Sequence, residues 1–251
     1  MADPAFWPIL LGVLGLVFGS FIATIAVRWP VQRSIADGRS VCDACGDTLS
    51  AYELVPVLSY AVLLGRCASC RAPIRPVHVT VELLALAIGV AAGWVAPGGE
   101  GVAGAVFGWL LLALAVLDLK TFWLPNELTG ALAVTGIVSG FWLEPDMLSR
   151  LIGGAGGWFV LMFVASAYRV LRGKDGLGGG DPKLFGAIGL WLGWRELPVV
   201  LLAACATGLV LVLLLRVGGR RMGMHDRVPL GVLLAAAAFG VWIAGRLGYY
   251  A

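Results

Sequence analysis

Two aspartates, Asp118 and Asp181, are the residues whose type and surroundings best suit chemistry. Asp118 ends the apolar run LLALAVLDLK, and Asp181 follows the glycine-rich stretch GLGGG. An ionisable residue at membrane depth is energetically costly, so by default it indicates a functional site. Two carboxyl groups that share one proton can hydrolyse a peptide bond, because one activates water while the other polarises the carbonyl. The pair therefore predicts an aspartyl hydrolase.

The glycine-rich stretch before Asp181 is the element that must position this carboxylate. Such a run indicates a backbone that bends sharply or approaches another group closely. Asp181 followed by Pro182 predicts a helix N-cap and then proline at the first position of an apolar helix. We expect Gly178, Gly180 and Lys183 to support Asp181. Because aspartate is a common N-cap, a purely structural role for Asp181 is the competing interpretation.

Four cysteines form two Cys-x-x-Cys pairs with 21 residues between them: Cys42, Cys45, Cys67 and Cys70. Four thiolates on two tight turns suit tetrahedral zinc, and they leave no open position for a substrate, so we expect a structural role. Gly46 and Arg71, which follow the two pairs, fit such turns. Two disulfides are the alternative, but a reducing cytoplasm disfavours them.

The elements that carry these residues are membrane helices. The chain has 251 residues, 60% of them hydrophobic and 13% charged, and its mean hydropathy is +0.92. This composition excludes an ordinary soluble domain and predicts an all-α polytopic membrane protein with about eight transmembrane helices. The apolar runs lie near 5–27, 79–96, 103–118, 129–143, 149–170, 183–194, 197–215 and 228–247. The runs at 129–143 and 183–194 are short, so we expect them to stand nearly upright or to begin within protein.

Basic residues predict the orientation because they gather in alternate loops. The basic loops hold Arg28, Arg33, Arg39, Arg66, Arg71, Arg75, Lys120, Arg169, Arg172, Lys174, Lys183, Arg216, Arg220, Arg221 and Arg227. The other loops and the two ends hold only Arg150, Arg195 and Arg246. By the positive-inside rule the basic loops are cytoplasmic, so both aspartates and the four cysteines share that side. The net charge of +3 follows from this rule and does not indicate nucleic acid as a partner.

The order of these motifs resembles the type IV prepilin peptidases, the bifunctional leader peptidase/N-methyltransferases of pilus and type II secretion systems. GSFIATIAVRWP (19–30) is similar to the family's opening motif, GSFLNVVIxRxP, and ELVPVLSYAVLLGRCASC with the following VELL is similar to its zinc-loop region. DLKTFWLPNELT (118–129) and KDGLGGGDPKL (174–184) resemble its two catalytic motifs. VPLG (228–231) is a weaker echo of a proline-glycine motif in the last span.

The resemblance implies a multi-pass protein of the bacterial inner membrane whose catalytic residues, Asp118 and Asp181, face the cytoplasm. Its substrates would be prepilins or pseudopilins, cleaved after a glycine and then N-methylated from S-adenosylmethionine. We expect a first transmembrane span at 1–27, a cytoplasmic zinc-binding loop domain at 28–78 and a seven-span aspartyl peptidase core at 79–251. The sequence does not indicate the oligomeric state.

Three residues of this chain bear on the resemblance beyond the aspartates. Ala23 replaces the asparagine of the opening motif, and Val232 replaces the second proline of the last-span motif. The first departure concerns the amino-terminal half, with which methyl transfer is usually associated. Glu82, within VELL, is the carboxylate we nominate as a structural or S-adenosylmethionine-contacting residue.

Two other functions compete with prepilin processing. In a non-enzymatic transporter or scaffold, Asp118 and Asp181 would bind a cation or a proton. That reading explains intramembrane carboxylates but neither the four-cysteine loop nor the glycine run. A Gly-x-Gly-Asp peptidase acting on other membrane helices is the third reading.

Overall fold

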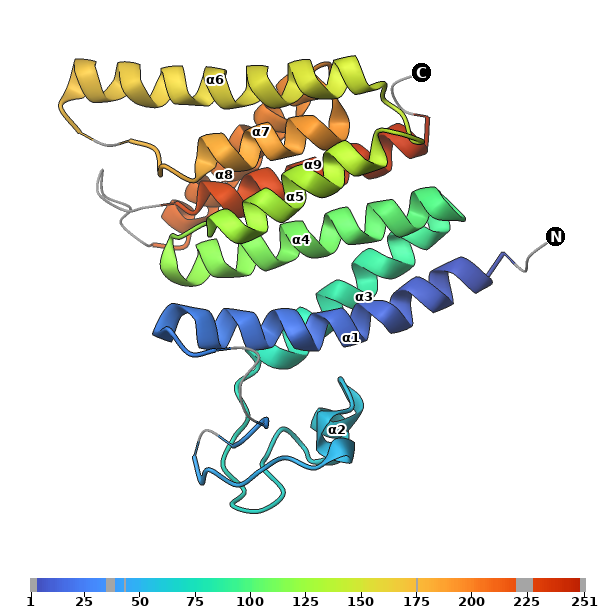
Figure 1. Cartoon of the computed structure of the whole chain (residues 1–251). Helices are drawn as coiled ribbons and strands as arrows, with labels where there is room; N and C mark the ends of the chain where they lie inside the picture. Colours follow the sequence, from blue (N-terminus) through green and yellow to red (C-terminus); the bar gives the residue numbers. More distant parts are fainter. Residues whose placement is uncertain (1–3, 35–38, 43, 175, 220–227, 249–251) are drawn as a thin grey trace. The chain divides into compact units, whose positions relative to one another are not determined.

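The structure, a computed structural model, describes residues 4–34, 39–42, 44–174, 176–219 and 228–248. Arg220, Arg221, Arg227 and Asp175 lie outside the described residues. The long helices are α1 (Phe6–Arg28), α3 (Val77–Val95), α4 (Gly99–Thr121), α5 (Asn126–Ser139), α6 (Met147–Arg172), α7 (Asp181–Leu192), α8 (Leu197–Val217) and α9 (Leu230–Arg246) (Figure 1). The loop after α1 adds two short 3-10 turns, η1 (Trp29–Val31) and η2 (Ala51–Leu54), and the one-turn helix α2 (Leu58–Val62). The all-α prediction is confirmed.

Each of the eight predicted apolar runs forms one of the long helices. Five of them, α1, α3, α4, α6 and α8, are long and apolar enough to cross a membrane. The other three are shorter: α5 has 14 residues, α7 has 12 and α9 has 17. A count of eight full spans therefore stays a prediction.

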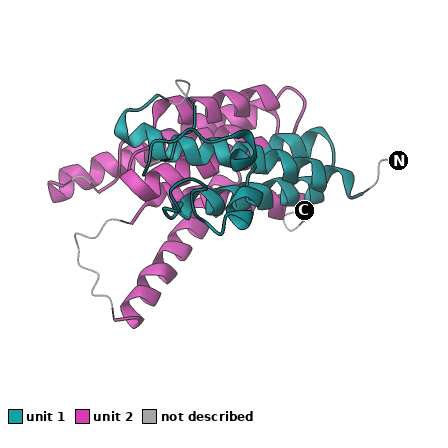
Figure 2. Cartoon of the chain, turned by 90° about the horizontal axis from the view of Figure 1, so that it is seen from below, with its two compact units in different colours: residues 1–105 teal, residues 106–251 magenta. Residues whose placement is uncertain are grey.

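The chain divides into two compact units, residues 1–105 and residues 106–251, with the division inside α4 (Figure 2). The first unit contains α1, the cysteine loop and α3. The second contains most of α4 and all of α5 to α9, with both aspartates. The predicted three-part division at 1–27, 28–78 and 79–251 stays a prediction.

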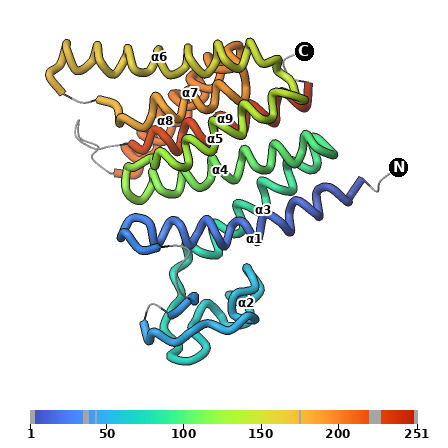
Figure 3. The backbone as a smooth tube through the Cα atoms, in the orientation of Figure 1, coloured from blue at the N-terminus to red at the C-terminus, as the bar shows by residue number. Residues whose placement is uncertain are grey.

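In the first unit, α1 and α3 pack against each other through glycines on both helices. A Cβ at Gly19 would lie 2.7 Å from the Cα atom of Glu82, and one at Gly93 would lie 2.6 Å from the carbonyl oxygen of Trp7. Midway along, Gly89 lies against the carbonyl of Leu11 in the same manner. Small residues let the two backbones touch, which is how helices associate in lipid. The helices are antiparallel, as the tube in Figure 3 shows.

In the second unit, the short helix α7 is buried along almost its whole length. Glycines of α6 and α7 touch: a Cβ at Gly186 would lie 2.9 Å from the carbonyl oxygen of Gly154. On another side, Trp191 Nε1 donates a hydrogen bond of 2.8 Å to the Leu132 carbonyl of α5. The ring of Trp191 also stacks on Phe107 of α4, at 4.8 Å between centroids. Protein therefore surrounds α7, in agreement with the expectation that this short run begins within protein.

Arg150 was counted as a loop charge, and this interpretation is wrong. The structure places Arg150 in the first turn of α6, where it is buried. Its side chain is 1% exposed. The guanidinium donates to the Gly136 carbonyl of α5 at 2.9 Å and to the Leu190 carbonyl of α7 at 3.0 Å. Further acceptors are the carbonyls of Leu143, Glu144 and Pro145 and the hydroxyl of Ser139. Arg150 thus joins the ends of three helices.

Candidate active site

Asp118 lies near the end of α4, where its carboxyl group is 5% exposed. Its Oδ2 accepts a hydrogen bond of 3.2 Å from the backbone N–H of Val232, in the first turn of α9. Gly231 makes this approach possible, because a Cβ there would lie 2.8 Å from the same oxygen. The amino-terminal turn of a helix offers unpaired N–H groups and a partial positive charge, both of which stabilise a carboxylate. The start of α9 therefore positions Asp118.

Asp181 is the first residue of α7, and its side chain is 7% exposed. Its Oδ2 accepts a hydrogen bond of 3.0 Å from the backbone N–H of Gly178, three residues earlier. A Cβ at Gly178 would lie 3.1 Å from that oxygen. The glycine-rich stretch therefore folds back onto the carboxylate, as its composition predicts.

The prediction that Asp181 is the N-cap of α7 is wrong by one residue. Gly180 is the N-cap, and no side chain caps the helix. The reason is that the Asp181 carboxylate accepts the upstream Gly178 N–H rather than an N–H of its own first turn. The carboxylate is held by its loop, which argues against a purely structural capping role.

Leu124, in the turn between α4 and α5, brings the two aspartate environments together. Leu124 is 8% exposed, and its side chain lies beside both Gly180 and Gly231. A Cβ at Gly180 would lie 2.7 Å from Leu124 Cβ, and one at Gly231 would lie 3.2 Å from Leu124 Cδ2. The carboxyl groups of Asp118 and Asp181 also interact electrostatically. Two buried carboxyl groups from different helices thus share one site.

Lys183 forms a second link between the two motifs. Its Nζ donates a hydrogen bond of 2.7 Å to Oδ1 of Asn126, the first residue of α5. Asn126 follows the Asp118 motif and Lys183 follows Asp181, so the bond ties together the starts of α5 and α7. Lys183 is exposed, and the described hydrogen bond of its ammonium group goes to Asn126 and not to Asp181.

Four residues of the site were not foreseen as site residues: Leu124, Asn126, Gly231 and Val232. Leu124 and Asn126 lie inside the DLKTFWLPNELT motif, so their neighbourhood was a signal. Gly231 lies in the weak VPLG echo. Val232 was noted only as the replacement of a proline, and nothing in the sequence indicated that its backbone N–H bonds to Asp118.

Glu82 belongs to the first unit, where it is buried on α3 at 7% exposure. Its Oε2 accepts a hydrogen bond of 2.8 Å from the backbone N–H of Val57 in the cysteine loop. Val57 has a φ of 63°, which a β-branched residue rarely adopts. Glu82 therefore fastens a strained turn of the loop to the helix pair. Its nomination as a cofactor contact stays a prediction.

The four cysteines gather at two equivalent turns. The backbone N–H of Gly46 donates to the carbonyl of Cys42 at 2.9 Å, and that of Arg71 donates to the carbonyl of Cys67 at 3.0 Å. Gly46 and Arg71 both have positive φ, of 73° and 60°. An isolated antiparallel bridge closes each turn, Val41 with Thr48 and Arg66 with Pro73. Both residues that follow the cysteine pairs thus occupy the predicted turn position.

The cluster fits a tetrahedral metal ion. All four sulfur atoms lie within 4.8 Å of one another, and those of Cys42 and Cys70 are 3.9 Å apart. Zinc bound at about 2.3 Å by four thiolates places the sulfurs roughly 3.8 Å apart. The N–H groups of Cys45 and Ala44 lower the pKa of Cys42 to about 7. The Asp47 N–H lowers the pKa of Cys45, but the neighbouring Cys70 and Cys42 sulfurs outweigh this effect. The pKa of Cys45 therefore rises to about 12. A divalent cation would relieve this repulsion between thiolates.

Comparison with known proteins identifies the family. Residues 13–96 match the family described as the bacterial peptidase A24 N-terminal domain, and residues 105–213 match the type IV leader peptidase family. The chain is 38% identical to a prepilin leader peptidase/N-methyltransferase of Burkholderia pseudomallei, over 94% of this chain and 85% of the relative. The chain belongs to the type IV leader peptidase family.

Two further relatives of this leader peptidase carry the same name. The protein of Aeromonas hydrophila is 38% identical over 82% of this chain and 70% of its own length. That of Klebsiella pneumoniae is 36% identical over 80% of this chain and 92% of its own length. No solved structure matches the chain. The two family matches meet between residues 96 and 105, close to the division between the compact units.

Proposed function

We propose that this leader peptidase is a membrane aspartyl endopeptidase that cleaves the leader peptides of type IV prepilins and type II secretion pseudopilins. The observation that carries the proposal is that Asp118 and Asp181 are two buried carboxyl groups whose neighbouring glycines, Gly231 and Gly180, both lie against Leu124. Each is held by a backbone N–H, from Val232 and Gly178 respectively. The substrate class comes from the relatives, which are named for prepilin leader cleavage.

The site supports hydrolysis with one proton shared between the two carboxyl groups. The ionised group takes a proton from a water molecule, whose oxygen attacks the carbonyl carbon of the scissile bond, while the protonated group donates a hydrogen bond to the carbonyl oxygen. The carboxyl group that took the proton from water passes it to the leaving nitrogen as the tetrahedral intermediate collapses. Like charges in a buried site cannot both ionise easily, so the pair holds one proton over a wide pH range.

The glycines around the pair leave room for the substrate. A Cβ at Gly179 would meet nothing within 4 Å, so an extended peptide backbone can approach the loop that holds Asp181 at this point. The basic residues of alternate loops favour the cytoplasmic face of the bacterial inner membrane for this site. A substrate whose cut bond lies at that membrane surface would present it to both aspartates.

The cysteine cluster would hold one structural zinc ion. Four thiolates fill a tetrahedral coordination sphere, so the metal would fold the loop and would not bind substrate. Cys42, Cys45, Cys67 and Cys70 are the ligands. This site belongs to the first unit, whereas the aspartates belong to the second.

We also propose that the chain N-methylates the new amino terminus, since its relatives are named N-methyltransferases. S-adenosylmethionine would supply the methyl group. One Glu82 oxygen already binds the Val57 N–H, and the asparagine of the opening motif is Ala23, which is fully buried on α1. These residues do not make a recognisable cofactor site, so methyl transfer rests on the relatives alone.

The test is cleavage of a prepilin by membranes that contain the chain. Cleavage that requires both aspartates supports the proposal. A transporter or scaffold would give no cleavage with any variant. A peptidase for other membrane helices would cut those substrates but leave the prepilin intact. Labelled S-adenosylmethionine, added with the cleaved pilin, tests methyl transfer separately.

A further inference from the structure

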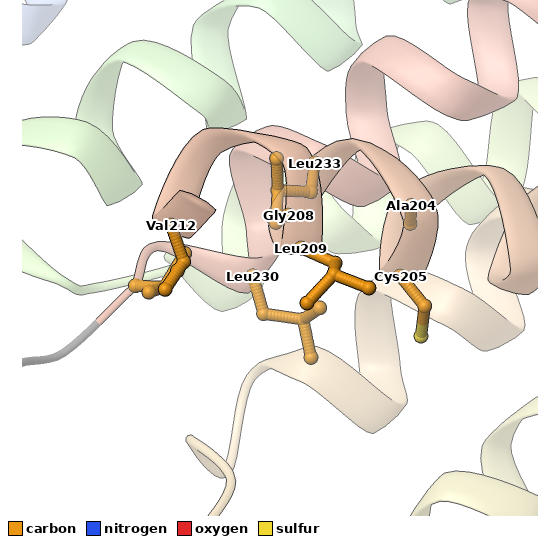
Figure 4. Close-up of a pocket in the computed structure, with 8 residues that line it drawn as sticks. Ala204, Cys205, Gly208, Leu209, Val212, Leu230 and Leu233 are labelled. Atoms are coloured by element: carbon orange, nitrogen blue, oxygen red, sulfur yellow. The ribbon is translucent and has the colours of Figure 1, made fainter. Parts of the chain in front are cut away.

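An apolar groove lies between α8 and the start of α9, in the second unit. Its volume is about 280 Å³. The floor consists of Ala204 and Gly208, which are buried, and the exposed side chains of Cys205 and Leu209 border it on α8. Leu230 and Leu233 border it on the α9 side (Figure 4). Gly208 lies close to Leu233 of α9, because a Cβ at position 208 would lie 2.8 Å from Leu233 Cδ1.

The chemistry of the groove restricts its occupant. Every side chain that lines it is apolar, and the Cys205 thiol is the most polar group present. Small-molecule sites usually have about 300–1,000 Å³ and a few placed polar groups. A cofactor such as S-adenosylmethionine, with its charges and hydroxyls, would find no hydrogen-bond partner here. The groove suits a few aliphatic side chains from one face of an apolar helix.

The position of the groove connects it to the catalytic pair. Leu230, which lines the groove, directly precedes Gly231 and Val232, the residues that contact Asp118. The first turn of α9 thus presents side chains to the groove and backbone groups to the carboxylate. The end of the groove at Leu230 is therefore one residue away from Gly231, which lies against Asp118. This continuity distinguishes the groove from the rest of the exposed apolar surface of α8.

We propose that the groove between α8 and α9 binds the apolar segment of the peptide substrate that lies next to the scissile bond. This inference rests on the proposed peptidase function. In a membrane, apolar side chains gain little merely by leaving lipid, so van der Waals packing against Cys205, Leu209 and Leu230 supplies the attraction. The substrate helix would place residues at i, i+3 and i+4 in the groove. The groove would thereby hold the substrate in register while the cut bond reaches the aspartates.

Cys205 allows a direct test, because its thiol borders the groove and is exposed. An Asp181→Asn enzyme is mixed in membranes with a prepilin that carries single cysteines at successive positions after the scissile bond. Copper phenanthroline then oxidises facing thiols to a disulfide. We expect cross-links at helical spacing, and none with Cys205→Ser. The control is the double variant Cys205→Ser, Val210→Cys, which moves the thiol to the face of α8 that points away from the groove. Val210 is 53% exposed there. Cross-linking at Val210→Cys as strong as at Cys205, or no cross-link at Cys205, would overturn the proposal.

A second experiment fills the groove in the active enzyme. Cys205→Trp should lower kcat/KM for full-length prepilin by at least about tenfold, mostly through KM, because it removes uniform binding. Val210→Trp adds the same bulk on the opposite face and should change kcat/KM by less than about twofold. Equal activity of the two variants at wild-type level refutes groove binding while leaving the peptidase function intact. Failure of the unmodified enzyme to cleave any prepilin refutes the proposed function itself.

Discussion

The backbone N–H of Val232 donates a hydrogen bond of 3.2 Å to the carboxylate of Asp118, 114 residues earlier in the chain. The motif that this segment resembles has a proline in place of Val232, and proline has no N–H to donate. Val232 therefore gives Asp118 a hydrogen bond that a proline at this position could not supply. Hydrogen bonds to charged groups contribute about 1.5–3 kcal/mol, which is enough to affect the protonation of the pair.

Replacing Val232 with proline should preserve the fold and alter the pH–rate profile. The N–H of a first-turn residue has no acceptor within its helix, so proline removes no helical hydrogen bond. Loss of the bond to Asp118 makes the carboxylate form less favourable, so the acid limb should move to higher pH. The profile of prepilin cleavage between pH 4 and 9 measures this, with Val232→Ala, which keeps the N–H, as the control. Superimposable profiles of the proline and alanine variants would show that the bond is unimportant.

Each catalytic aspartate should be essential. Asp118→Asn or Asp181→Asn removes an ionisable partner from the pair, and we expect prepilin cleavage to fall by about 10²–10⁴-fold or more. Membrane insertion and metal content should remain those of the unchanged chain. Asp175→Asn and Asp226→Asn, at positions outside the described residues, should still cleave. Substantial cleavage by a well-folded Asp181→Asn variant is incompatible with the mechanism.

Replacing Gly231 or Gly180 with alanine should impair the enzyme, and each has a control glycine where an added methyl group should be tolerated. A Cβ at Gly231 would lie 2.8 Å from Asp118 Oδ2, whereas one at Gly240 on the same helix meets nothing within 4 Å. A Cβ at Gly180 would lie 2.7 Å from Leu124, whereas one at Gly179 also meets nothing within 4 Å. Gly231→Ala and Gly180→Ala should lower kcat/KM by about 10²-fold, because catalytic geometry tolerates little displacement. Gly240→Ala and Gly179→Ala should stay near the wild-type rate, and a similar loss in those controls would contradict the argument.

Arg150 should matter for stability and not for chemistry. Arg150→Met leaves several carbonyl oxygens and the Ser139 hydroxyl without their buried donor. Each unsatisfied buried acceptor costs about 1–3 kcal/mol, so we expect a loss of at least about 3 kcal/mol in the free energy of unfolding. Thermal unfolding in detergent measures it. Arg195→Met, which removes only a contact with the Trp194 ring 5.7 Å away, is the control and should change the midpoint little.

Zinc removal should unfold the cysteine loop. We expect elemental analysis to find one zinc ion per chain, retained in Cys205→Ser and lost in the Cys42→Ser, Cys67→Ser double variant. Metal binding and loop folding are coupled, so limited proteolysis should then cut within the loop. Stoichiometric disulfides in freshly isolated, thiol-blocked protein would contradict a metal site.

Much of the fold and site followed from local features of the sequence. Apolar runs mark helices because a membrane-embedded backbone must satisfy its own hydrogen bonds. The cysteine cluster followed because Cys-x-x-Cys pairs fix their turns locally. The partners of Asp118 did not follow, because a backbone N–H 114 residues away leaves no pattern. Arg150 was counted with the loop charges when the basic residues were used to predict orientation, yet it is buried and backbone carbonyls at helix ends accept its hydrogen bonds. The start of α7 shifted by one residue because Asp181 bonds to its loop and not to its helix.

The glycine contacts between α1 and α3 have a consequence for the cysteine loop. The loop leaves α1 after Arg28 and enters α3 at Val77, and the contact between Gly19 and Glu82 holds the two helices together near these points. The helix pair makes that contact through its own backbones. The contact between α1 and α3 therefore already brings the two ends of the loop close together. Folding of the loop then costs little additional loop-closure entropy. Such an insertion can change in length or in metal content while the membrane scaffold that carries it remains the same.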